Sequence, residues 1–148
     1  MRGPASIFIF DHFHVRPDRM VCDLRMAEAR FAALDAPGII AADLADRLVE
    51  RFPSLPDHAC VNDSGPTFGS CMAHASMPHL LEHVVIALQA EAEAADSSVV
   101  YPLVFVGTTR WTDRAALAAR IEVNYRDDIT AFCAFRDAAA IIDSIVLE

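Results

Sequence analysis

The sequence contains few glycines and no closely spaced cysteines, and each absence excludes a class of protein. Its five glycines form neither G-x-x-x-x-G-K nor G-x-G-x-x-G, so the two common glycine-rich nucleotide-binding loops are absent. Its four cysteines form no C-x-x-C pair, which argues against a zinc ribbon or a thioredoxin-type redox site. We expect all four, Cys22, Cys60, Cys71 and Cys133, to be reduced thiols in the core.

Basic charge and long apolar runs are also scarce. The formal net charge is −9 and no basic cluster offsets it locally, so we expect no nucleic-acid partner and an easier approach for a cationic one. No stretch reaches the roughly 20 uncharged apolar residues that span a bilayer. The apolar piece at residues 7–10 is too short for the core of a signal peptide. We therefore expect a soluble, cytoplasmic protein without membrane contact.

What the sequence does have is enough apolar material for one compact domain over residues 1–148. Hydrophobic residues make up 54% of the chain, which is ample for a core at this length and also makes a homodimer plausible. Residue periodicity predicts an α+β fold, a small two-layer sandwich in which helices pack on a mostly antiparallel sheet. The expected strands are 6–10, 20–26, 98–106 and 120–126, the expected helices are 41–51, 77–93 and 129–146, and loops cover 52–76 and 107–118.

The pentad His79-Leu80-Leu81-Glu82-His83 is the most informative motif. Ser76 is a suitable N-cap and Pro78 fits a first helical turn, so a helix is expected here. On a helix, positions i, i+3 and i+4 share one face, so both imidazoles can bind a single Zn²⁺ while Glu82 acts as general base. This is the inverzincin arrangement. A purely structural trio, with Glu82 as the hydrogen-bond partner of two core histidines, is the alternative.

The region around the pentad carries a family resemblance. The segment Leu55-Pro56-Asp57-His58-Ala59-Cys60 is followed by a loop with Gly65, Phe68 and Gly69, and then by the pentad helix ending in Leu88-Gln89. This ordered set resembles the N-terminal domain of cyanophycin synthetase, and weaker similarity extends over nearly the whole chain. From its length of 148 residues we expect the chain to lack the ATP-grasp and Mur-ligase-like modules of that family.

The resemblance implies two roles. The family domain is implicated in holding a polymer with an aspartate backbone and arginine side chains, and in some members it looks like a metal-dependent hydrolase that cuts this polymer. An acidic domain is electrostatically suited to an arginine-bearing substrate.

A catalytic zinc needs a third protein ligand, and its identity is open at this point. Where relatives tend to have Glu, this chain has Asn124. Glu122 lies two residues earlier, on the same face of the expected strand, so it is our first choice. Asp57 and His58, from the long loop, are the other candidates.

Further side chains are candidates for substrate contact. His58 comes from the long loop, whereas Arg110 and Trp111 come from the expected loop 107–118, where an arginine could orient a substrate carboxylate. Each also has an ordinary explanation: a packed loop anchor, a solvated cation and a ring capping the core edge. His12 and His14 form a possible second metal pair.

Two functional hypotheses follow. The first is a zinc-dependent hydrolase of amide or isopeptide bonds in a peptide-like or arginine-bearing substrate, with His79, His83 and Glu122 as ligands and Glu82 as base. The second is a non-catalytic accessory domain that binds polymer or peptide and has lost the full metal site. Asn124 favours the second, and the intact His79, Glu82 and His83 favour the first, which we prefer.

Overall fold

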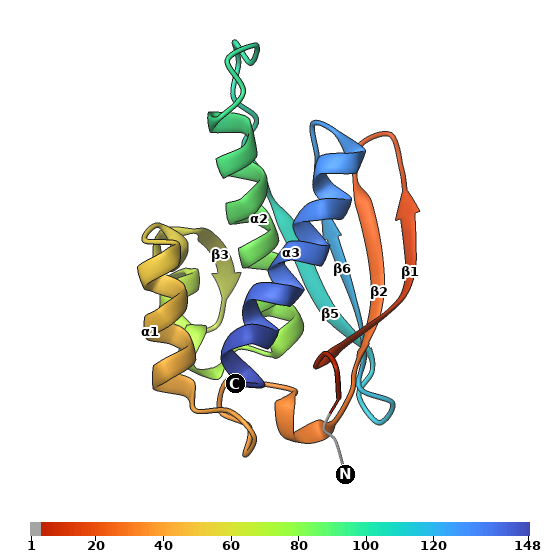
Figure 1. Cartoon of the computed structure of the whole chain (residues 1–148), viewed down its shortest axis with the longest axis vertical. Helices are drawn as coiled ribbons and strands as arrows, with labels where there is room; N and C mark the ends of the chain where they lie inside the picture. The colour runs from red at the N-terminus through yellow and green to blue at the C-terminus, as the bar shows by residue number, and fades with distance from the viewer. Residues whose placement is uncertain (1–3) are drawn as a thin grey trace.

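A four-stranded antiparallel sheet forms one layer of the molecule and helices form the other (Figure 1). The computed structural model describes residues 4–148. The sheet has the order β1-β2-β6-β5, and the short strands β3 and β4 form a separate hairpin. The strands are β1 (Phe8–Val15), β2 (Met20–Met26), β3 (Ala59–Asn62), β4 (Gly65–Thr67), β5 (Gly107–Asp113) and β6 (Ala118–Val123), and the helices are α1 (Ala41–Arg51), α2 (Met77–Ala94) and α3 (Asp128–Val146). The expected two-layer α+β sandwich is confirmed.

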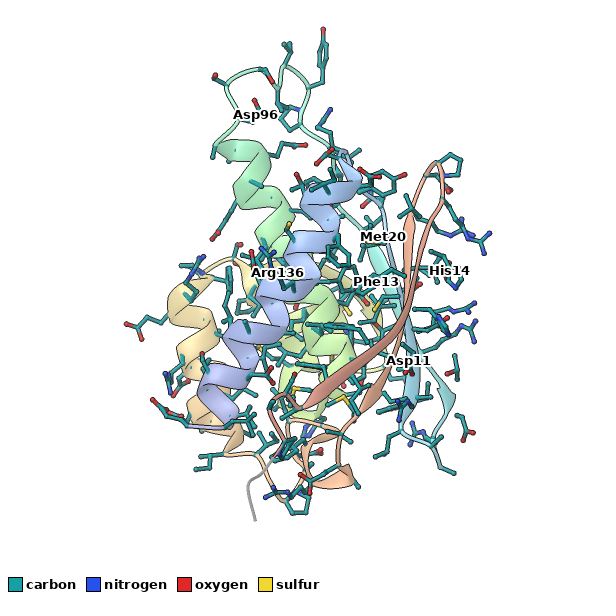
Figure 2. All side chains as sticks on the ribbon, turned by 45° about the vertical axis from the view of Figure 1, so that its right-hand side comes forward. Asp11, Phe13, His14, Met20, Asp96 and Arg136 are labelled. Carbon is teal, nitrogen blue, oxygen red and sulfur yellow. The ribbon has the colours of Figure 1, made fainter. Side chains whose placement is uncertain are left out.

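The two faces of the sheet follow from residue alternation in its strands. In β6, Ala119, Ile121 and Val123 are buried, whereas the intervening residues are only partly buried. Successive side chains of a strand point to opposite faces, so one face of the sheet packs on the helices and the other meets solvent. Figure 2 shows the same division in the β1–β2 hairpin, where Phe13 points toward α3 and His14 projects from the opposite face.

Helix α2 is the central element of the helical layer. The Ser76 hydroxyl accepts a hydrogen bond from the His79 amide at 3.2 Å, and Pro78 lies in the first turn, as the sequence predicts. Its apolar residues are buried around most of its circumference, because α2 packs against α3 and against β5 and β6. Among the described residues, no helix combines the length and apolarity needed to cross a bilayer.

The structure differs from the sequence-based expectation between α2 and β6. The expected strand 98–106 is not a strand, and the expected loop 107–118 contains β5. The apolar run before β5 is largely exposed, with Tyr101 83% and Val104 78% accessible. Composition alone suggested a strand there, but pairing with β6 begins only at Gly107.

The other differences are shifts of boundary. The first strand covers Phe8–Val15 rather than 6–10, and the last strand ends at Val123 rather than at 126. The expected loop 52–76 contains the β3–β4 hairpin and several 3-10 turns. This hairpin brings one side of the functional site toward α2.

Candidate metal centre

The first two turns of α2 carry the pentad side chains into a shared cluster. Glu82 and His83 are almost fully buried, at 3% and 2% accessibility, and His79 is half-buried. The His79 and His83 ring centroids lie 5.0 Å apart, as expected for residues one helical turn apart. The helix therefore gathers two imidazoles and a carboxylate at one place.

Strand β3 adds a thiol to the two imidazoles. The Cys60 Sγ lies 3.3 Å from His79 Nε2. One ligand atom each from Cys60, His79 and His83 can be chosen so that all three lie within 4.8 Å of one another. Sulfur and imidazole nitrogen are the ligands that zinc prefers. The cluster could therefore hold a metal ion.

Glu122, the first choice for the third ligand, lies elsewhere. It belongs to the face of β6 that points away from α2, and its Oε1 accepts a hydrogen bond from Arg19 Nε at 2.8 Å. Strand alternation keeps it on that face, because Ile121 and Val123 occupy the face toward the helices. Geometry thus replaces Glu122 with Cys60 as third candidate ligand. Asp57 is exposed and outside the cluster.

The state of His83 fits a metal ligand. Its Nε2 is buried and has no hydrogen-bond partner among the described residues, an arrangement that costs about 1–3 kcal/mol when nothing compensates it. Its Nδ1 lies 3.1 Å from His58 Nδ1. When His83 donates from Nδ1 to His58, its Nε2 keeps a lone pair available for a metal.

Burial also keeps the imidazoles neutral, as metal ligation requires. Desolvation, together with the neighbouring His79 and His58, lowers the pKa of His83 to about 3. Burial likewise lowers the pKa of His79 and of His58. The Phe68 ring stacks on the His83 ring at 4.0 Å between centroids and so fixes the plane of that imidazole.

Glu82 is held beside the cluster by β5. Its Oε1 accepts a hydrogen bond from the Thr109 hydroxyl at 2.7 Å, and its Oε2 lies 3.6 Å from His83 Nε2. Burial raises the pKa of Glu82 to about 7, although the Thr109 hydrogen bond acts in the opposite direction. A Cβ at Gly107 would lie 3.0 Å from Glu82 Cγ, so glycine makes room for the carboxylate.

The cluster opens into a cleft of about 560 Å³ between the β3–β4 hairpin and β5. Residues of α2 form its floor, the segment 58–61 forms one wall, and the segment 104–109 forms the other. Glu82 is the one acidic side chain among the lining residues. The cleft is therefore bordered mainly by apolar and backbone groups.

Of the three residues predicted to contact substrate, only one lines the cleft. His58 lines the cleft and contacts His83. Arg110 is exposed on the solvent face of β5, and Trp111 is half-buried against the core with Arg114 over its ring, so neither lines the cleft.

The possible second metal pair lies far from this cleft in the sheet. His12 and His14 belong to β1, with ring centroids 6.0 Å apart. Among the described residues, they do not join a metal-capable cluster.

Sequence reasoning missed several residues of the site. Cys60 is visible in the family-like segment, two positions after His58, but the sequence analysis predicts only a reduced core thiol there. Thr109 and Gly107 were not found, because residues 107–118 were assigned to a loop. Phe68 gave no signal beyond its place in the family-like loop.

One comparison with known protein families gives a match that covers this region of the chain. The family model described as cyanophycin synthase-like N-terminal domain matches residues 25–147. The match extends from β2 to the end of α3 and includes every residue of the cluster. No curated protein matches the chain.

Proposed function

The chain belongs to the family of cyanophycin synthase-like N-terminal domains, and from this premise we propose that it is a zinc-dependent hydrolase of amide or isopeptide bonds in a peptide-like substrate. The observation that carries the proposal is the buried, partnerless Nε2 of His83 beside Cys60 and His79, with Glu82 next to them at the floor of a cleft. A structural core has no need of an unpaired imidazole nitrogen, whereas a metal ligand does.

Cys60, His79 and His83 would hold the metal. Three protein ligands, with one position left for water or substrate, are the usual complement of a catalytic zinc. When bound, zinc supplies Lewis acidity that polarises a carbonyl oxygen and lowers the pKa of water.

Glu82 would act as the general base. It takes a proton from the attacking water at Oε2 and later donates that proton to the leaving nitrogen, while Thr109 fixes Oε1. A pKa of about 7 suits both directions of this transfer near neutral pH. The partly apolar cleft limits the access of bulk water to this carboxylate.

The alternative is a non-catalytic domain that binds peptide or an arginine-bearing polymer. Two contacts favour it: Cys60 with His79, and His58 with His83, each within hydrogen-bonding distance. These contacts give the Cys60 thiol and one ring nitrogen of each histidine a partner without a metal. Among the fully buried side-chain nitrogen and oxygen atoms of the described residues, only His83 Nε2 has no partner.

Metal content decides between the two. We would purify the protein without a His-tag and measure zinc by elemental analysis in the wild type and in the His79→Ala and Glu82→Gln variants. The hydrolase requires near-stoichiometric zinc that is lost in His79→Ala and kept in Glu82→Gln. It also requires that the zinc-loaded wild type, but not Glu82→Gln, cleaves amide bonds in a set of peptides that includes arginine-bearing ones. Absence of zinc after zinc is supplied would leave the binding domain.

A further inference from the structure

Strand β5 is the terminal strand of the sheet (Figure 1). Its residues Gly107, Thr108 and Thr109 line the cleft. One edge of β5 pairs with β6, in a register that places Thr108 opposite Glu122 and Thr109 opposite Ile121. A terminal strand presents unpaired backbone N–H and C=O groups, which can pair with another extended chain. Here the strand with this unpaired edge lies next to the candidate base.

The register shows which backbone groups of β5 face the cleft. The Asn124 amide donates to the Val106 carbonyl at 3.2 Å, so Val106 is a residue whose backbone points toward β6. In an antiparallel ladder, this direction alternates from residue to residue. The backbone groups of Thr108 therefore point toward β6, and those of Gly107 and Thr109 point toward the open edge.

The side chain of Asn124 lengthens this edge beyond the end of β6. Its Oδ1 accepts a hydrogen bond from the Val106 amide and its Nδ2 donates to the Val104 carbonyl, both at 2.8 Å. The amide group thus takes the place of a paired strand and holds residues 104–106 in line with β5. The result is an ordered, extended edge from Val104 to Thr109.

Several apolar side chains that line the cleft are exposed to solvent. Val61 on one wall and Val104 and Val106 on the other are 105%, 78% and 57% accessible. Exposed apolar groups gathered around a cleft are typical of a ligand-binding site. Because Glu82 is the one acid among the lining residues, the walls suit small or apolar side chains better than cationic ones.

We propose that an extended peptide binds in this cleft as an additional strand on β5, held by backbone hydrogen bonds to Gly107 and Thr109, with small or apolar side chains against the walls. The inference rests on the proposed function for its assumption that the peptide is a substrate. Strand addition takes affinity from main-chain hydrogen bonds and selectivity from the side chains at alternate positions.

The position of Thr109 explains how such a strand would meet the catalytic group. Its hydroxyl orients Glu82 while its backbone faces the edge. A peptide bond paired with Thr109 therefore lies beside Glu82 and the imidazoles of α2. The bond to be cleaved is accordingly a main-chain amide rather than an amide at the end of a long side chain.

Hydrogen exchange tests the proposal within one strand. The probe is a blocked hexapeptide of alanine and valine, added up to its solubility limit to wild-type protein, with and without zinc, and followed by amide exchange in NMR. We expect exchange at Gly107 and Thr109 to slow by about tenfold or more, because these amides gain a partner. Thr108 and Arg110, already paired with β6, are the internal controls and should not change.

Methylation of the peptide supplies an independent test. Two peptides are made, one methylated at the odd backbone nitrogens and the other at the even ones. One of them should bind about tenfold more weakly than the unmethylated peptide, while the other keeps its affinity, since only alternate N–H groups face β5. Equal loss in both, or unchanged exchange at Gly107 and Thr109, would overturn strand addition.

The outcomes keep this inference separate from the hydrolase. Zinc retention and peptide cleavage without the exchange pattern would refute strand addition and leave the hydrolase standing. The exchange pattern and the alternation without zinc retention would refute the hydrolase and leave a strand-binding domain. A peptide in which arginines replace the valines should bind more weakly, and equal or tighter binding would refute the apolar preference of the walls.

Discussion

Carboxyl groups next to the two faces of the sheet have pKa values shifted in opposite directions. On the solvent face, Arg25 donates to Asp11 at 2.9 Å and Arg120 donates to Asp23 at 2.7 Å, and these hydrogen bonds lower the pKa of both acids. On the helix face, Glu82 has a hydroxyl rather than a cation as its hydrogen-bond donor, and burial raises its pKa to about 7. The same functional group is thus stabilised as an anion on one face and as a neutral acid on the other.

This difference separates ion pairs that only support the fold from ionisable groups that indicate a functional site. Exposed ion pairs, such as those on the solvent face, add little to the stability of the fold. A buried carboxylate without a cation and a buried imidazole nitrogen without a partner both cost stability. Groups with such strongly shifted pKa values, gathered in a cleft, indicate a functional site.

The largest expected effect concerns the metal ligands. Replacing Cys60 by Ser should weaken zinc binding by about 100-fold or more, because loss of a direct ligand exceeds the loss caused by changes around the ligands. Glu122→Gln, on the opposite face, should leave zinc affinity unchanged. Competition with a chromogenic chelator measures both. Loss of zinc affinity in Glu122→Gln alone would return the third ligand to the strand position favoured by sequence.

The next effect is a pH dependence that belongs to Glu82. In metal-free protein, Glu82 stays protonated up to about pH 7, whereas in the unfolded chain it ionises near its ordinary pKa of 4.5. A raised acid pKa means that folding becomes less favourable as pH rises from 4.5 to 7, by on the order of 3 kcal/mol. Urea denaturation at both pH values should show this loss relative to Glu82→Gln. Parallel pH curves for the two proteins would contradict it.

The smallest effect is expected on the solvent face. Arg25→Gln removes the partner of Asp11, and at neutral pH it should lower the Tm by less than about 2 °C. The pKa of Asp11 is lowered from 3.8, so its contribution is complete above 3.8 and is lost as pH falls through the folded value. The Tm difference should therefore vanish in acid and shrink in high salt. A large difference at neutral pH would erase the contrast between the two faces.

Local sequence signals were sufficient for the helices. The expected helix 41–51 coincides with α1, and the N-cap Ser76 with Pro78 located the start of α2. Caps and helical periodicity act within a few residues, so one sequence contains them. The motif His79, Glu82 and His83 was found for the same reason, since α2 alone sets its spacing.

Signals that depend on distant partners were not sufficient. The strand expected at 98–106 failed because a strand is defined by its pairing, and β6 ends before reaching that segment. The third ligand was sought at Glu122 because this residue lies two positions before Asn124, on the same face of the expected strand. Asn124 is the position where relatives tend to have Glu. Cys60 meets His79 only after the β3–β4 hairpin folds against α2, and no periodicity records that contact.

If a metal binds between Cys60 and His79, it also affects the stability of the folded chain. The two residues are 19 positions apart, one on a small hairpin and the other on the central helix. A zinc ion bound by both residues would act as a cross-link across that loop and would reduce the freedom of the unfolded chain, much as a disulfide does. For a closed loop of this length that restriction is worth about 3 kcal/mol. Loading the site would then tighten the hairpin wall of the cleft in the same step that equips it for chemistry.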